Sequence, residues 1–222
     1  MPTQRPSLVS GELYHVYNRG VEKRIIFPTD NDYRRFISAL RFFNTARPVT
    51  LREFFIFEKT GIGSLYPEEP LVQIGSFILM TNHYHLLVKQ LVDKGLSLFM
   101  QKLGAGYTGF FNLKHSRSGA LFQGRYKIKW IDNDRYGRYI QAYIPLNALD
   151  GVTHEWREAG IKDKKKSLAI LKSHPWSSFS SYTDQNKFPG IINPSFIYHF
   201  FEDINEFQNF VLSWSADDLK EI

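Results

Sequence analysis

The sequence predicts an α+β domain, with helices on one face of an antiparallel sheet and a helical C-terminal extension. Short segments of alternating or continuous apolar residues are typical of strands, and longer segments with apolar residues at helical spacing separate them. The expected order is strand, helix, two or three strands, helix, strand, helix, which is that of a ferredoxin-like or split βαβ fold. A soft boundary near residues 150–166 divides the chain into a first domain, residues 1–150, and an extension, residues 151–222, that packs on it.

The first part of the chain supplies a strand, a helix and a loop. Residues 13–16 form a short strand that ends in a turn at residues 18–20. Residues 30–44 form a helix, because their apolar positions recur at helical spacing behind capping residues. Residues 51–57 have β character, and residues 59–70 form a loop because Gly and Pro interrupt them.

The middle of the chain holds two apolar stretches, residues 71–80 and 83–89, separated by Thr81 and Asn82. They form either a hairpin or one long bent strand. Later elements are a helix over 96–114 that contains three glycines, a basic strand over 121–131, a helix over 135–148 that Pro145 must bend or end, and a helix over 201–214.

Composition narrows the functional classes. Among 222 residues there is no cysteine, which excludes disulfides, thiolate catalysis and Cys-ligated metal sites. A net charge of +6 favours nucleic acid as a partner, then anionic membranes, although a merely soluble basic protein is the plain alternative. Neither a signal-peptide core nor a membrane-length apolar run is found, so we expect a cytoplasmic protein.

The segment His83-Tyr84-His85 lies inside an apolar strand. Side chains alternate between the faces of a strand, so the two histidines point the same way and Tyr84 points to the other face. Two neutral imidazoles on one face can chelate a divalent ion, which needs at least one further ligand. The alternative is a pair of half-buried histidines satisfied by hydrogen bonds. Because such burial in an apolar strand is costly, metal binding or catalysis is favoured.

Tyr107 lies among small residues, with Gly104, Gly106 and Gly109 around it, which would allow a bulky partner to approach closely. A tyrosine in a chain with 12 of them is more often a core or surface residue, so the residues alone leave its role open.

Residues 116–129 alternate basic side chains with aromatics and glycines. In a strand, Arg125, Lys127 and Lys129 would share one face and form a stripe suited to phosphates. The alternative is a solvent-facing edge strand protected by its charge. The basic character of the whole chain favours nucleic acid.

Six segments, in this order, resemble the REP-associated tyrosine transposases, within the wider single-tyrosine class of His-hydrophobe-His (HUH) transposases. Each is weak evidence alone, whereas the ordered set over most of residues 8–182 is specific. The family commonly has Pro where this chain has Thr81, and around residues 145–148 it often has a His or Glu followed later by Asn-Pro. The segments are 14–20 (YHVYNRG), 80–87 (MTNHYHLL), 107–112 (YTGFFN), 119–127 (GALFQGRYK), 143–147 (YIPLN) and 176–178 (WSS).

The resemblance implies a metal-dependent transposase, a DNA endonuclease that nicks and rejoins single-stranded DNA through a 5′-phosphotyrosine. It implies that His83 and His85 bind Mg²⁺ or Mn²⁺ and that Tyr107 is the nucleophile. The third ligand is usually a polar residue one helical turn beyond the tyrosine. Phe111 stands there, so Asn112 is the candidate, although on an ideal helix it points about 140° away from Tyr107.

The implied partner is single-stranded DNA with a REP-like hairpin, flanked by a recognition tetranucleotide. Aromatic and arginine side chains would stack on bases, and the extension is a further candidate for DNA contact. The resemblance leaves monomer and homodimer open, and requires no membrane or small-molecule cofactor. The DNA-binding candidates are Asn18 and Arg19 for bases, Arg117, Arg125, Lys127 and Lys129 for the backbone, and Gln123 in the same basic segment.

Three rival functions remain at this stage. A non-catalytic nucleic-acid-binding regulator on the same scaffold would need no metal and would form no covalent adduct. A metal-dependent hydrolase that uses water would need the histidines but not Tyr107. A structural protein with buried histidines would gain no thermal stability from Mn²⁺.

Overall fold

A computed structural model describes residues 7–60, 69–152, 155–183 and 187–215. Its centre is an antiparallel sheet in the order β2-β3-β1-β4. The strands are β1 (Leu13–Arg19), β2 (Val72–Met80), β3 (His83–Gln90) and β4 (Lys127–Ile131). This order, with helices between β1 and β2 and between β3 and β4, is the ferredoxin-like arrangement, which confirms the predicted α+β class.

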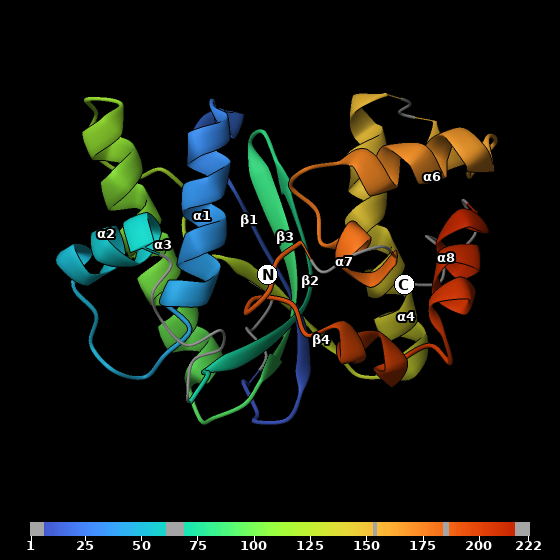
Figure 1. Ribbon diagram of the computed structural model, residues 1–222, viewed down its shortest axis with the longest axis horizontal. Helices are drawn as coiled ribbons and strands as arrows, with labels where there is room; N and C mark the ends of the chain where they lie inside the picture. The colour runs from blue at the N-terminus through green and yellow to red at the C-terminus, as the bar shows by residue number, and fades with distance from the viewer. Residues whose placement is uncertain (1–6, 61–68, 153–154, 184–186, 216–222) are drawn as a thin grey trace, which may run out of the picture.

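One face of the sheet carries α1 (Asp30–Phe42), α2 (Leu51–Thr60) and α3 (Gly95–Lys114), on the left in Figure 1. Tyr84 of β3 faces this layer, where its ring meets Phe36 of α1 at 4.9 Å between centroids and Phe122 at 5.9 Å. The aromatic core of this layer fixes α1 and α3 against the sheet.

The helix α2 replaces the β segment predicted at residues 51–57, so that prediction is wrong. Thr50 and Glu53 form a capping box, in which the Glu53 amide donates to Thr50 Oγ1 and the Thr50 amide donates to Glu53 Oε2. The Phe54 ring stacks on Phe42, at 4.7 Å between centroids. The Thr-x-x-Glu signature of a helix start is present in the sequence at residues 50–53. Most of the predicted 59–70 loop lies outside the described residues.

The other face carries α4 (Asp134–Leu146) and the extension, on the right in Figure 1. The extension also bonds to the sheet directly, because the Leu79 amide donates to the Trp176 carbonyl at 2.9 Å. The sequence predicted helices on one face of the sheet only, whereas α4 and the extension form a second layer on the other face. The division at residue 150 stays a prediction. Elements after α4 are η2 (Asn147–Gly151), α5 (Trp156–Ala159), α6 (Lys164–Ser173), α7 (Phe179–Thr183), η3 (Pro194–His199) and α8 (Ile204–Leu212).

β2 and β3 form a hairpin that turns at Thr81 and Asn82, which decides between the two predicted alternatives, a hairpin or one long bent strand. Met80 lies opposite His83 across the turn, so the two apolar stretches are separate strands. β1 continues through residues 18 and 19, where a turn was expected, and β4 begins only at Lys127. A backbone φ of +98° at Gly124 interrupts the predicted 121–131 strand. In the described residues, no helix has the length and apolar character needed to cross a membrane.

Candidate active site

A histidine cluster lies on the face of the sheet that α4 covers. His85 of β3 lies beside β1, where its Nδ1 is 2.8 Å from His15 Nε2. The rings of His83 and His85 are 5.2 Å apart, as the strand alternation predicts for neighbours on one face. Tyr143 of α4 meets His85 edge-on at 5.7 Å and His15 at 6.2 Å between ring centroids.

The environment keeps these imidazoles neutral. Burial lowers the pKa of His15 to about 3, and the charge of Lys129 adds to this effect. Burial also holds the pKa of His85 well below its ordinary value. Burial and, to a smaller extent, the Arg19 cation lower the pKa of His83 to about 4. Neutral imidazoles keep a lone pair, which a metal ligand or general base needs.

Hydrogen bonds fix which nitrogen of each ring is available. His83 Nδ1 lies 2.7 Å from Asn82 Oδ1, which can only accept, so Nδ1 carries the hydrogen and Nε2 keeps a lone pair. In the His15–His85 contact one nitrogen must donate to the other. If His85 Nδ1 donates, His85 Nε2 also keeps a lone pair. The His15–His85 bond equally satisfies two buried rings, as expected if the histidines have only a structural role.

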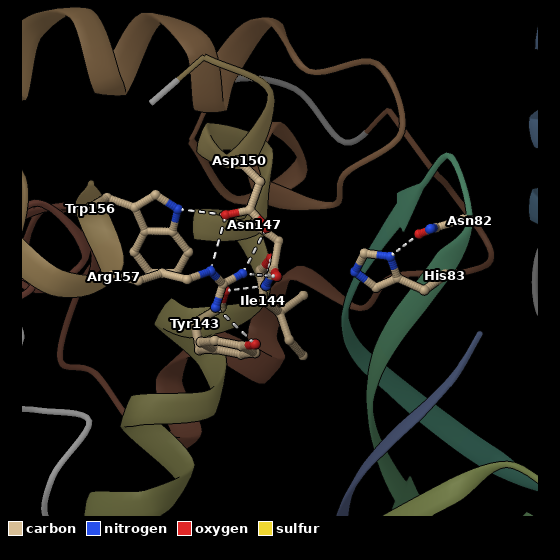
Figure 2. A network of polar contacts seen from close by, with 8 residues as sticks. All are labelled: Asn82, His83, Tyr143, Ile144, Asn147, Asp150, Trp156 and Arg157. Carbon is tan, nitrogen blue, oxygen red and sulfur yellow. Dashed lines mark hydrogen bonds and ion pairs between the residues drawn. The ribbon is translucent and has the colours of Figure 1, made fainter. Parts of the chain in front are cut away.

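Beside the cluster, α4 and the extension form a polar network, drawn in Figure 2 with the His83 ring turned towards it. Arg157 donates to the Tyr143 hydroxyl at 3.2 Å and to Asn147 Oδ1 at 2.8 Å. It also donates twice to the Asp150 carboxylate, at 2.8 and 3.1 Å. The Trp156 indole donates to the same carboxylate at 2.7 Å. Asn147 follows Tyr143 by one helical turn.

Tyr107 does not lie with the histidines, which corrects its predicted position. It is on α3, across the sheet, where its ring packs on Phe36 and Phe122 and is 1% exposed. Its hydroxyl donates to the Ile26 carbonyl at 2.6 Å. Burial raises the pKa of this phenol far above its ordinary value, and the Asp32 charge adds to this effect. A buried, hydrogen-bonded phenol of this kind is a core residue.

Asn112 is likewise separated from the histidine pair. It lies near the end of α3, where its amide nitrogen donates to the Gly119 carbonyl and its oxygen accepts from Arg117. Arg117 donates in addition to the Ala120 carbonyl. Both side chains hold the loop after α3, so the predicted metal ligand Asn112 is on the wrong face of the sheet.

Some predicted DNA-binding residues gather on the histidine face. Arg19 lies opposite His83, and Lys127 and Lys129 lie opposite Tyr17 and His15. Because partners across an antiparallel pair share a face, these three cations surround the cluster. All three are exposed.

Two other candidates lie at a surface cavity of about 620 Å³ beside α3. Asn18 donates to the Gly124 carbonyl and accepts from the Arg19 amide, which makes it a support for the loop. Arg125, two residues before β4, is exposed and lines this cavity. Gln123 is exposed in the same loop.

Donor atoms for a divalent ion are present, but they do not form a closed protein site. Among the described residues, no group of three or more His, Asp or Glu side chains could hold an ion. His83 Nε2, His85 and the Asn147 amide oxygen, which accepts from Arg157, are the candidate ligands, and burial keeps both imidazoles neutral. This set fits an open site that substrate and water oxygens complete.

Residues 143–147 belong to the family resemblance, but no role was predicted from the sequence for Tyr143, Asn147 or Arg157. Tyr143 and Asn147, the C-cap residue of α4, are four residues apart, the spacing expected between a nucleophilic tyrosine and a third metal ligand. That signal was available in the sequence. The sequence carries no comparable signal for Arg157, because its contact with Tyr143 depends on how the extension packs against α4.

The fold and site together define an α+β protein with a histidine, tyrosine and arginine cluster on one sheet face. No protein family model matches the chain, and no curated protein matches it. A solved structure described as "Structure of the REP associates tyrosine transposase bound to a REP hairpin" is similar, with a TM-score of 0.53 and 13% identity over 87% of this chain and 92% of that one. At this identity the likeness shows the shared fold and a distant structural relationship.

Proposed function

We propose that this chain is a transposase-type DNA endonuclease and strand transferase that acts on single-stranded DNA at hairpin-associated sites. Tyr143, in place of Tyr107, is the nucleophile. The observation that carries this proposal is the position of the Tyr143 ring on His85, with its hydroxyl bonded to Arg157. The similar solved structure is a tyrosine transposase bound to a REP hairpin, which supports a nucleic-acid hairpin as the partner.

The proposed reaction uses the Tyr143 phenol, which lies beside neutral imidazoles and cationic arginine and lysine side chains. Tyr143 Oη forms a bond to the scissile phosphorus while the bond from phosphorus to the 3′-oxygen breaks. The phenol proton leaves to water, and the 3′-oxygen takes up a proton. The 5′-phosphate stays on Tyr143 as an ester. A second 3′-hydroxyl then displaces the tyrosine and rejoins the strand without ATP, because one phosphodiester replaces another.

His83, His85 and the Asn147 amide oxygen would hold Mg²⁺ or Mn²⁺ beside this tyrosine. Asn147 takes the place of Asn112 as the third ligand. The ion would polarise a non-bridging oxygen of the scissile phosphate when bound. His15 acts one step behind, because its hydrogen bond sets which nitrogen of His85 keeps its lone pair.

Arg19, Lys127 and Lys129 would hold DNA phosphates around the site, since they are exposed on the same face. Arg125 and Gln123 would extend this contact towards the cavity beside α3. Asn18 and Arg117 act through the loop that they support. A cytoplasmic location fits this chemistry, and monomer and homodimer remain alternatives.

A covalent-adduct assay tests the nucleophile. Single-stranded oligonucleotides with a fixed hairpin stem and a randomised flanking tetranucleotide are incubated with the protein and Mn²⁺. A label at the 3′ end should stay on the protein in a denaturing gel, whereas a 5′ label should be released. The variant Y143F should lose the adduct.

The variant Y107F is the matched control. It removes one buried hydrogen bond and should cost about 1 kcal/mol of stability, while adduct formation persists. Y17F is a second control, because the Tyr17 ring also stacks on His85, at 5.5 Å between centroids. Adduct formation should persist in this variant too. Adduct from Y143F at the wild-type rate would refute Tyr143 as the nucleophile.

A non-catalytic DNA-binding regulator is the second candidate. The lack of a closed three-residue metal site among the described residues favours it. In that case the native gel would show a shifted hairpin, but no label would survive denaturation with any variant.

A further inference from the structure

The C-terminal extension contributes a side chain to the candidate active site. Arg157 belongs to α5, beyond the predicted boundary at residue 150, and its guanidinium reaches the Tyr143 hydroxyl on α4. The guanidinium carbon also lies 5.4 Å from the centre of the Tyr143 ring and 4.4 Å from that of Trp156. The extension therefore touches the atom that would attack DNA.

We propose that Arg157 is a further catalytic residue, which holds Tyr143 Oη in place and stabilises the negative charge on it during attack. This proposal rests on the function proposed above, because it gives Arg157 a role only if Tyr143 is the nucleophile. A fixed donor aimed at a developing oxyanion is among the strongest contributions that a protein makes to catalysis.

Asp150 fixes the orientation of the arginine. Its carboxylate accepts from Nε and Nη2 of Arg157, which leaves Nη1 to face the tyrosine. The Trp156 indole donates to the same carboxylate and holds it in turn. A guanidinium fork held by a carboxylate at one edge presents its other donors with a defined direction.

Arg157 remains a cation throughout. Burial lowers its pKa, but the hydrogen bonds and charges of Asp150 and Tyr143 outweigh burial and raise it above the ordinary value. It can therefore donate a hydrogen bond to the tyrosine oxygen but cannot remove the phenol proton. The same guanidinium bonds to Asn147 Oδ1, so one side chain positions both the nucleophile and the amide one turn beyond it.

The chain offers a matched control in Arg138, which also ties α4 to the extension. Arg138 donates to the Phe200 carbonyl and to Glu206, at 2.6 Å each. Its side chain is 30% exposed, compared with 32% for Arg157, so the two are similarly accessible. Within the described part of the chain its partners are Phe200, Glu206, Phe201 and Phe210 rather than Tyr143, so its loss would test a structural bridge alone.

The experiment measures the single-turnover rate of adduct formation with the 3′-labelled hairpin pool and Mn²⁺, for the wild type, R157Q, R157K, R157A and R138Q. DNA affinity and thermal melting are measured for each. We expect R157Q to slow the adduct step by about 100-fold with little change in affinity, R157K to recover part of the rate, and R138Q to react like the wild type. Free guanidinium should restore part of the rate to R157A.

Three results separate the possibilities. If R157Q and R138Q lose rate only in proportion to their melting temperatures, and guanidinium rescues nothing, Arg157 is structural and the inference is overturned. If Y143F loses the adduct while R157Q keeps the wild-type rate, the inference fails but Tyr143 stands. If Y143F forms the adduct as well as the wild type, the proposed function itself fails and Arg157 loses its role with it.

Discussion

At the scale of single residues, the site depends on histidines that the fold keeps uncharged. His15 and His85 share a hydrogen bond of 2.8 Å and are 5% and 7% exposed. Burial places the folded pKa of each below the ordinary value of 6.5. The same neutrality that suits a metal ligand makes the native state sensitive to acid.

The sign of this sensitivity follows from proton binding. Below pH 6.5 the unfolded chain binds protons at His15 and His85 that the folded chain does not, so acid favours unfolding. We expect the histidine contribution to the free energy of unfolding to be nearly constant between pH 7 and 8 and to fall between pH 6.5 and 5 by up to about 1.4 kcal/mol per pH unit for each histidine. Urea unfolding at pH 7.5 and 5.5 measures it. The variant H15Q should show a shallower decrease, and an equal slope in both proteins would contradict this account.

At the scale of elements, α3 explains the glycines around Tyr107. The sequence suggested that these small residues admit a bulky partner, and the partner is part of the protein itself. A Cβ on Gly106 would come within 2.5 Å of the Phe43 ring, whereas one on Gly109 would meet no atom within 4 Å. Gly106 therefore lets α3 pack closely on the end of α1, and no substrate is needed to account for it.

Alanine substitution separates the two glycines. G109A should stabilise the protein by up to about 1 kcal/mol, because alanine favours a helix and the space is open. G106A should instead destabilise it by about 1–3 kcal/mol through overpacking against Phe43. Chemical denaturation of the two variants measures the difference. A stabilising G106A would mean that Phe43 moves aside at little cost.

At the scale of the whole molecule, the extension and the sheet share one core. The Trp214 ring packs on Tyr139 of α4 at 4.8 Å and on Trp156 at 5.7 Å between centroids. Trp176 stacks on Tyr33 of α1 at 4.6 Å, which brings the extension into contact with the first helical layer as well. Such contacts on both sides favour unfolding as a single unit.

Tryptophan fluorescence and circular dichroism test this expectation. The chain has four tryptophans, and three of them, Trp156, Trp176 and Trp214, belong to the extension. Fluorescence therefore reports mainly on residues after 150, whereas far-ultraviolet dichroism reports on every helix. We expect the two thermal transitions to coincide, as for a two-state domain. An earlier fluorescence transition would show that the extension unfolds separately and that residue 150 is a domain boundary.

The sequence by itself determined the α+β class, the helices α1, α3 and α4, and the pairing of His83 and His85 on one face. These features depend on local periodicity, since residues two apart in a strand or four apart in a helix share a face wherever the element lies. The same reasoning could have identified the spacing between Tyr143 and Asn147.

Only the tertiary structure decided which of the two helical tyrosines, Tyr107 or Tyr143, accompanies the histidines. Tyr107 and Tyr143 are both on helices, and sequence periodicity cannot say which helix covers which face of the sheet. The structure places α3 with Tyr84 and α4 with His85, on opposite sides of β3. Arg157 depends on the same long-range packing. The physical reason is that strand alternation fixes the relative directions of neighbouring side chains, whereas the path of the chain over the sheet fixes what they meet.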